Sequence, residues 1–172
     1  MFFRPLTMAG VVIFGAILNG AVFNQYPIFG LEPDIMMLIM IAMILIERTA
    51  TPIIFTSVAA LFMDIMYSPA IGYYALPYAL VGIAAYFIFR RMTFSQFLVP
   101  PFAAAAGWLL KDILSAILAI LLGAEIEFMS VFMNKTLPGI ALNGILMLVV
   151  YWLLRLLYRA AYMQPPKRDE SF

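Results

Sequence analysis

The sequence predicts an all-α, polytopic membrane protein with six transmembrane helices. Of its 172 residues, 66% are hydrophobic and 11% are charged, whereas soluble proteins average about half and about a quarter. So few polar residues cannot cover the surface of a soluble fold of this size, and lipid is therefore expected to be the solvent for most of the chain. The chain has no cysteine and no histidine, which excludes disulfides, thiolate metal sites and the commonest general base.

Apolar runs between charges and turn residues predict the individual helices. The first run is too long for the core of a cleavable signal peptide. The second has about 16 residues and covers about 24 Å, against about 30 Å for a hydrocarbon core. This helix must therefore tilt little, thin the bilayer locally, or be supported by neighbouring protein segments. The predicted helices are residues 6–26, 33–48, 52–66, 72–89, 101–122 and 137–157, within one membrane domain (1–163) followed by a disordered, charged tail (164–172).

The basic residues predict the orientation of these helices. Six spans place eight of the ten basic residues on one side, namely Arg4, Arg48, Arg90, Arg91, Arg155, Arg159, Lys167 and Arg168. Lys135 lies on the other side, together with most acidic loop residues, and Lys111 lies inside the membrane. Because basic residues mark the cytoplasmic side, both termini are predicted to be cytoplasmic. A re-entrant second helix would give five spans and place Arg48 outside, so six spans are favoured.

Two adjacent charges, Lys111 and Asp112, lie at the centre of the fifth predicted helix. A charge at the bilayer centre costs at least about 2.5 to 3.5 kcal/mol, so it normally faces protein or water. Residues at intervals of four form a stripe of small side chains around the lysine: Ala103, Gly107, Lys111, Ser115, Ala119 and Gly123. Such a stripe predicts a helix-packing face with the lysine buried in it. Asp112 is rotated by about 100° and is poorly placed to pair with its neighbour.

Asp64 is the predicted partner of Lys111. The third and fifth helices run in the same direction, and the two residues lie at depths that agree within about 3 Å when counted from Pro52 and Pro101. The pair permits two interpretations, an ion or proton path and a structural buried pair. The structural interpretation is favoured, because a path needs a chain of further polar groups.

Other residues suggest weaker hypotheses. The uncharged polar residues Asn19, Asn24, Gln25 and Asn143 are expected to form hydrogen bonds across helices rather than a ligand pocket. The 13 methionines permit either an adaptable binding surface or flexible filler against lipid. Residues 123–135 are expected to form an amphipathic segment on the outer surface, where a partner has room to dock.

The motifs of common enzyme classes are missing from the sequence. It contains no phosphate-binding loop, no His-Glu zinc motif and no Gly-x-Ser-x-Gly elbow. A membrane enzyme that uses Asp64 and Asp112 as a carboxylate pair is the weakest hypothesis, because a hydrolase needs a water-accessible site with further polar groups. The chain is therefore expected to be neither an enzyme nor a protein that binds a cofactor or metal.

Several segments resemble the rod shape-determining protein MreD family. The resemblance includes Glu-Pro-Asp before an aliphatic run (32–38), the segment 62–76 with its aspartate and glycine, Tyr-Ala-Leu-Val-Gly (78–82), Asp112, and Leu-Asn-Gly (142–144). One departure is that Ala59 and Ala60 replace the glycines that precede the aspartate in the family. The resemblance spans nearly the whole chain and its six helices.

The resemblance implies a non-catalytic subunit of the bacterial cell-elongation complex in the plasma (inner) membrane. Such subunits are adaptors that bind MreC through membrane helices, with MreB filaments on the cytoplasmic face and peptidoglycan synthases outside. The family is also similar to the six-helix substrate-binding component of energy-coupling-factor transporters, which makes a vitamin-type transporter subunit the alternative function. Lipid surrounds the chain, no nucleic acid partner is expected, and dimerisation stays open.

The two functions require different sites. A vitamin-binding subunit needs an outward-facing cavity lined by aromatic and convergent polar groups. An adaptor needs an exposed groove or small-residue face for a foreign helix. Loss of the partner on replacing Ala103 or Gly107 by a bulky residue would locate that face on the fifth helix. The structural or partner-binding candidates are Asp34, Asp64, Gly72, Ala103, Gly107, Lys111, Asp112, Ser115 and Asn143.

Overall fold

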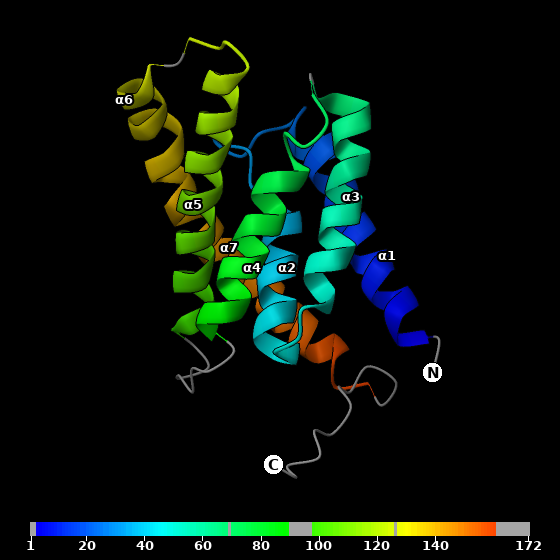
Figure 1. Ribbon diagram of the computed structural model, residues 1–172. Coiled ribbons are helices and arrows are strands. Elements are labelled where there is room, and N and C mark those ends of the chain that lie inside the picture. The colour runs from blue at the N-terminus through cyan, green and yellow to red at the C-terminus, as the bar shows by residue number, and fades with distance from the viewer. Residues whose placement is uncertain (1–2, 69, 90–97, 126, 161–172) are drawn as a thin grey trace.

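The computed structural model describes residues 3–68, 70–89, 98–125 and 127–160 as a bundle of helices (Figure 1). Within these ranges, the β-structure is limited to an isolated bridge between Ile28 and Leu31. The elements are α1 (Phe3–Ile17), the π-helix η1 (Leu18–Phe23), α2 (Ile35–Glu47), α3 (Thr51–Tyr67), α4 (Ala75–Phe89), α5 (Val99–Leu121), α6 (Phe128–Val131), the π-helix η2 (Phe132–Thr136) and α7 (Leu137–Leu157). The predicted all-α class is therefore confirmed.

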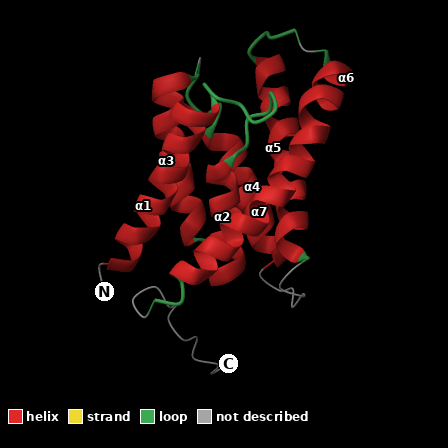
Figure 2. Cartoon of the chain, turned by 180° about the vertical axis from the view of Figure 1, so that it is seen from behind, coloured by secondary structure: helices red, strands yellow, loops and turns green. Residues whose placement is uncertain are grey.

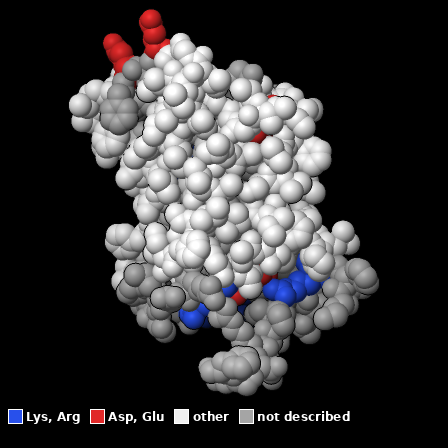
Figure 3. Space-filling model, viewed as in Figure 1, with Lys and Arg blue, Asp and Glu red and all other residues white. Residues whose placement is uncertain are grey.

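Successive long helices run in alternating directions, so that the start of α1 and the end of α7 lie at the same end of the bundle (Figure 2). That end carries Arg4, Arg48, Arg155 and Arg159, and we call it the basic end. The opposite end carries the loops with Glu32, Glu125 and Glu127, and we call it the acidic end. Figure 3 shows lysine and arginine gathered near the basic end of the visible face. Arg90, Arg91, Lys167, Arg168 and the predicted tail (164–172) lie outside the described residues.

Helix α2 forms the centre of the bundle. Every residue from Ile35 to Ile44 is buried, and the helix contacts α1, α3, α4, α5 and α7. A helix that is apolar on all sides is stable only when neighbours surround it. With 13 residues it is about 20 Å long, and it begins inside the bundle because the preceding loop enters from the acidic end (Figure 1). These contacts agree with the explanation that neighbouring protein supports the short helix.

Three outer helices approach α2 closely through glycines. A Cβ atom at Gly107 would lie 2.5 Å from Ile41 Cδ1, and one at Gly15 would lie 2.7 Å from Ile39 Cδ1. A Cβ atom at Gly82 would lie 2.9 Å from Met40 Sδ. Small residues at helix interfaces allow this approach in a lipid environment, where packing rather than water exclusion holds helices together.

Neither hypothesis about the methionines holds for α2. Its four methionines are fully buried in the core: Met36, Met37, Met40 and Met43. They contact neither lipid nor an adaptable outer surface. Unbranched, flexible side chains suit this position because they fill irregular gaps between five surrounding helices. Met66, at the end of α3, is 71% exposed and does fit the lipid-facing interpretation.

Two predicted boundaries need correction. The fourth helix begins at Ala75 rather than residue 72, because residues 72–74 form a turn before it. The last helix begins before residue 137, since α6 and η2 lead directly into α7 and residues 129–157 form one helical stretch. The predicted amphipathic surface segment is therefore, for the most part, the first turns of the last helix.

Three helical stretches are long and apolar enough to cross a membrane: Arg4–Phe23, Val99–Leu121 and Met129–Leu157. The helices α2, α3 and α4 are apolar but shorter, at 13, 17 and 15 residues. Large apolar side chains are exposed all along the bundle, for example Phe14, Phe62, Phe102 and Trp152. This surface suits lipid and identifies a membrane protein.

Candidate functional site

Asp34 lies at the amino end of α2, deep in the bundle, and is 2% exposed. It is the N-cap of this helix, because its Oδ1 accepts a hydrogen bond of 3.0 Å from the Met37 N–H. Its own backbone N–H donates to Asn143 Oδ1 of α7 at 3.0 Å. The Pro-Asp sequence before an apolar run is typical of a helix start. Here that helix start lies inside the protein.

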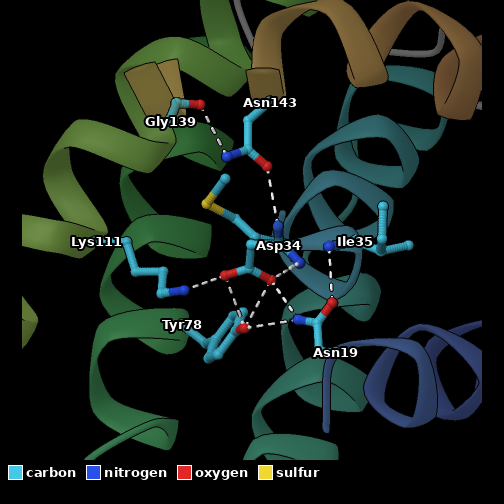
Figure 4. Close-up of polar contacts among 8 residues, drawn as sticks. Asn19, Asp34, Ile35, Tyr78, Lys111, Gly139 and Asn143 are labelled. Carbon is cyan, nitrogen blue, oxygen red and sulfur yellow. Dashed lines mark hydrogen bonds and ion pairs between the residues drawn. The ribbon is translucent and has the colours of Figure 1, made fainter. Parts of the chain in front are cut away.

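Three other side chains reach the Asp34 carboxylate (Figure 4). Lys111 Nζ of α5 forms an ion pair with Oδ2. The Tyr78 hydroxyl of α4 donates at 2.7 and 2.8 Å, and Asn19 Nδ2 of η1 donates at 2.7 Å. We call Asn19, Asp34, Tyr78, Lys111 and Asn143 the Asp34 cluster. It joins the first helical stretch, α2, α4, α5 and α7 at one point.

The two asparagines of the cluster also form hydrogen bonds with backbone groups. Asn19 Oδ1 accepts from the Ile35 N–H at 2.8 Å, and Asn143 Nδ2 donates to the Gly139 carbonyl at 2.9 Å. The cross-helix hydrogen bonds predicted for these two asparagines are confirmed. Asn24 and Gln25, in contrast, are exposed beyond the end of η1. A buried network is stabilising only when every member is paired, and this one is well paired.

Lys111 also lies over two aromatic rings. Its Nζ is 5.1 Å from the Trp108 ring centroid and 5.2 Å from the Tyr78 ring centroid. Ammonium groups within about 6 Å of an aromatic face gain cation–π attraction. The lysine side chain is 17% exposed. The charge is therefore compensated by Asp34 on one side and by aromatic rings on others.

The predicted pair of Asp64 with Lys111 is wrong, because Lys111 pairs with Asp34. The depth comparison considered only Asp64 and Lys111, because the predicted topology placed Asp34 among the acidic residues outside the membrane. In the structure, α2 starts inside the bundle and brings Asp34 to the level of Lys111. That lysine lies about 18 Å along α5 from Val99 at the helical rise. Asp112 does not pair with Lys111, as predicted.

Asp64 instead caps the start of α4. Its carboxylate accepts backbone N–H bonds from Gly72 at 2.8 Å, Tyr74 at 2.6 Å and Ala75 at 3.1 Å. Gly72 has φ of +98°, a conformation that only glycine adopts without strain. Three N–H donors compensate the charge at 2% exposure, and none of the described lysines or arginines forms an ion pair with it. We call Asp64 and this turn the Asp64 cap.

Asp112 holds the last helix near its start. Its Oδ2 accepts a hydrogen bond from the Thr136 hydroxyl of η2, and Trp108 Nε1 donates to the Thr136 carbonyl at 3.2 Å. A Cβ atom at Gly139 would lie 2.5 Å from Trp108 Nε1. This contact explains how closely α5 and α7 approach each other near the acidic end.

The small-residue stripe of α5 divides into two parts. Ala103 and Gly107 are buried, and the latter packs against Ile41 of α2 and Val81 of α4. Helices of the same chain already cover these two residues, so in this structure they present no exposed face to a foreign helix. Ser115 and Ala119 are half-buried, and Gly123 is exposed with φ of +88° at the helix end.

A small cavity of about 160 Å³ lies above the Asp34 cluster toward the acidic end. Aromatic side chains from α3, α4 and α5 line it together with charged groups of both signs. Its lining comprises Asn19, Gly20, Asn24, Glu32, Pro33, Asp34, Met63, Tyr67, Tyr73, Tyr74, Tyr78, Trp108, Lys111, Asp112, Ser115 and Lys135. Among the described residues, no group of three acidic side chains is placed to hold a metal ion.

A second polar cluster, which the sequence did not reveal, closes the basic end. The carboxylate of Glu47, at the end of α2, forms an ion pair with Arg4 at 2.9 Å. It also accepts from the Tyr158 hydroxyl at 2.6 Å and from the Thr49 hydroxyl at 2.9 Å. Burial, followed by the hydrogen bond to Glu47, raises the pKa of Tyr158, so its hydroxyl remains a donor at neutral pH. The only signal in the sequence was a glutamate at the end of an apolar run.

Comparison with known protein families gives one match. The family model of the rod shape-determining protein MreD matches residues 2–161, which is nearly the whole chain. No curated protein and no solved structure gives a significant match. The predicted similarity to energy-coupling-factor components therefore stays a prediction. The length of the family match decides the identity: the chain belongs to the MreD family of rod shape-determining membrane proteins.

Proposed function

We propose that the protein is a non-catalytic adaptor of the cell-elongation complex that binds MreC through its membrane helices. In this role it supports peptidoglycan synthesis and cell shape, alongside MreB filaments and the peptidoglycan synthases. Family membership over residues 2–161 is the observation that carries the proposal. The internal contacts support it, because Asp34, Asp64, Lys111 and Asp112 are each engaged by groups of the same chain.

The proposed membrane arrangement has six spans in the bacterial plasma membrane, with the basic end in the cytoplasm. The alternating helix directions (Figure 1) and the positive-inside rule support this orientation. A fluorescent protein fused after residue 172 should then be fluorescent, and alkaline phosphatase fused after Gly123 should be active outside the cytoplasm. The opposite pair of results would overturn the orientation.

A groove between α1 and α3 is our proposed docking site for the spanning helix of MreC. It measures about 300 Å³ and is lined by Ile13, Ala16, Ile17, Ala59, Phe62, Met63, Met66 and Tyr67. None of these described lining residues is charged, and the two alanines allow a foreign helix to approach closely. It lies on the half of the bundle toward the acidic end, where a helix leading to an external domain would leave the membrane.

Co-purification of MreC with the tagged protein after detergent extraction tests the proposal. Ala16→Phe should fill the groove and reduce the recovered MreC, while Ala141→Phe on the exposed side of α7 should not. Both variants should keep the thermal stability of the parent in detergent. If MreC does not co-purify with the parent protein, the adaptor role is wrong. If MreC stays bound to Ala16→Phe, the groove is wrong.

The acidic-end cavity is the observation that favours the alternative, a vitamin-type binding subunit. It has the aromatic lining and convergent polar groups that such a site needs, but about 160 Å³ is below the roughly 300 to 1,000 Å³ of most small-molecule sites. Several of its polar groups are also paired already in the Asp34 cluster. A stoichiometric small molecule detected by mass spectrometry in the purified protein would favour this alternative.

A further inference from the structure

A second and larger groove lies between α5 and α7 in the half of the bundle toward the basic end. Its volume is about 720 Å³. Leu148, Val149 and Trp152 form much of its apolar wall and are 46%, 52% and 60% exposed. This groove is independent of the α1/α3 groove and of the Asp34 cluster.

Two arginines lie at the basic end of this groove. Arg155 is in the last turn of α7, and Arg159 follows directly after it. Both are exposed, and both line the groove. Guanidinium groups match phosphate oxygens especially well, because they donate two parallel hydrogen bonds.

The length of the groove matches one leaflet of a bilayer. From Leu148 to Leu157, where α7 ends, the helix rises about 14 Å, and half of a hydrocarbon core is about 15 Å. Trp152 lies about one turn deeper than Arg155, at the level where indole rings favour the membrane interface. From the basic end inward, the lining of the groove is therefore first charged, then amphipathic at Trp152, and finally apolar at Leu148 and Val149. This sequence spans the depth of one lipid molecule.

We propose that the α5/α7 groove binds an anionic phospholipid of the leaflet at the basic end. Arg155 and Arg159 bind the headgroup phosphate, and an acyl chain lies along Leu148 and Val149. Basic residues beside a groove between membrane helices are suited to this recognition. A spanning partner helix fits less well, because it needs an apolar groove through both leaflets and has no phosphate to place between two arginines.

Native mass spectrometry of the full chain tests the proposal, with phosphatidylglycerol and phosphatidylcholine as competing lipids. The parent protein should retain phosphatidylglycerol preferentially. Because each basic residue near a membrane surface contributes about a fivefold gain in affinity for anionic lipid, Arg159→Gln should lower the preference by about that factor. The double variant Arg155→Gln/Arg159→Gln should remove most of it. Val149→Trp should block the acyl chain and reduce retention of phosphatidylglycerol.

Arg48→Gln provides the matched control, because Arg48 is also exposed at the basic end but does not line the groove. It should keep the parent preference. If Arg48→Gln and Arg159→Gln have equal effects, general surface charge explains the preference and the site is wrong. Loss of MreC or of a dimer in Val149→Trp, with lipid preference unchanged, would also overturn the proposal and assign the groove to a protein. The α1/α3 experiment with Ala16→Phe remains a separate test of the adaptor role.

Discussion

Asp34 and Asp64 are both 2% exposed, yet the protein compensates their charges in different ways. Asp34 is paired with a lysine 77 positions away and with polar side chains from other helices. Asp64 accepts three backbone N–H bonds from residues 8 to 11 positions later. The first arrangement joins distant helices, whereas the second shapes one turn. A buried carboxylate can therefore determine tertiary structure or local structure, depending on what donates to it.

The two sites also differ in whether a side-chain substitution would leave a buried charge without its ionic partner. Removing the cation at the Asp34 cluster leaves a buried charge that has lost its ionic partner. In the described part of the chain, the Asp64 carboxylate is held by backbone dipoles rather than by a cation. We therefore expect the Asp34 cluster to respond more strongly to substitutions of side chains around it.

The largest expected effect is that of Lys111→Met. It leaves the Asp34 carboxylate buried without its counter-charge, which in other proteins costs about 3 to 5 kcal/mol. The measurement is the free energy or midpoint of unfolding in detergent. Lys135→Met removes an exposed cation near the acidic end and should have little effect.

Adding Asp34→Asn to Lys111→Met should restore much of the lost stability, because the remaining amide is neutral and still hydrogen bonds to Tyr78. The same double substitution made with Asp64→Asn should not restore it. If Asp64→Asn does compensate for Lys111→Met, the ion pair assigned to Asp34 is incorrect.

An intermediate effect is expected for Asp64→Asn. The amide keeps one acceptor oxygen, so at least one N–H among Gly72, Tyr74 and Ala75 loses its partner, which costs about 1 to 3 kcal/mol. Because Asp64 and Lys111 share no partner, the losses in a double variant should add within about 0.5 kcal/mol. Strong non-additivity would show that the two sites are coupled and would weaken the contrast between them.

The smallest effects concern the neutral groups that support each aspartate. Asn143→Ala removes the acceptor of the Asp34 N–H and should cost about 1 to 2 kcal/mol, since both lost bonds are buried. Ser68→Ala removes local bonds in the half-buried turn beside Asp64 and should cost about 0.5 to 1 kcal/mol. Thermal unfolding in detergent checks the order. A larger loss for Ser68→Ala would contradict the view that the Asp34 cluster is the more sensitive site.

Much of the fold followed from local pattern. Apolar runs predicted each long helix, and Pro33 with Asp34 predicted a helix start, because capping depends on near neighbours. The end of the loop before α4 was harder, since Tyr73 and Tyr74 continue directly into the apolar run of the helix. The N–H groups of Gly72 and Tyr74 donate to Asp64, a residue of another helix, and these bonds help to hold the segment in a turn.

The sequence by itself determined that lipid surrounds the chain and that the fold is helical, because both depend on composition and on the pattern of apolar runs. It also determined that Lys111 needs protein around it, because a charge in hydrocarbon is costly. Only the tertiary structure decided which carboxylate meets that lysine. Ion pairing depends on the distance between charges in three dimensions, and that distance depends on where α2 begins within the bundle. Five surrounding helices set this position, and no local pattern in the chain encodes it.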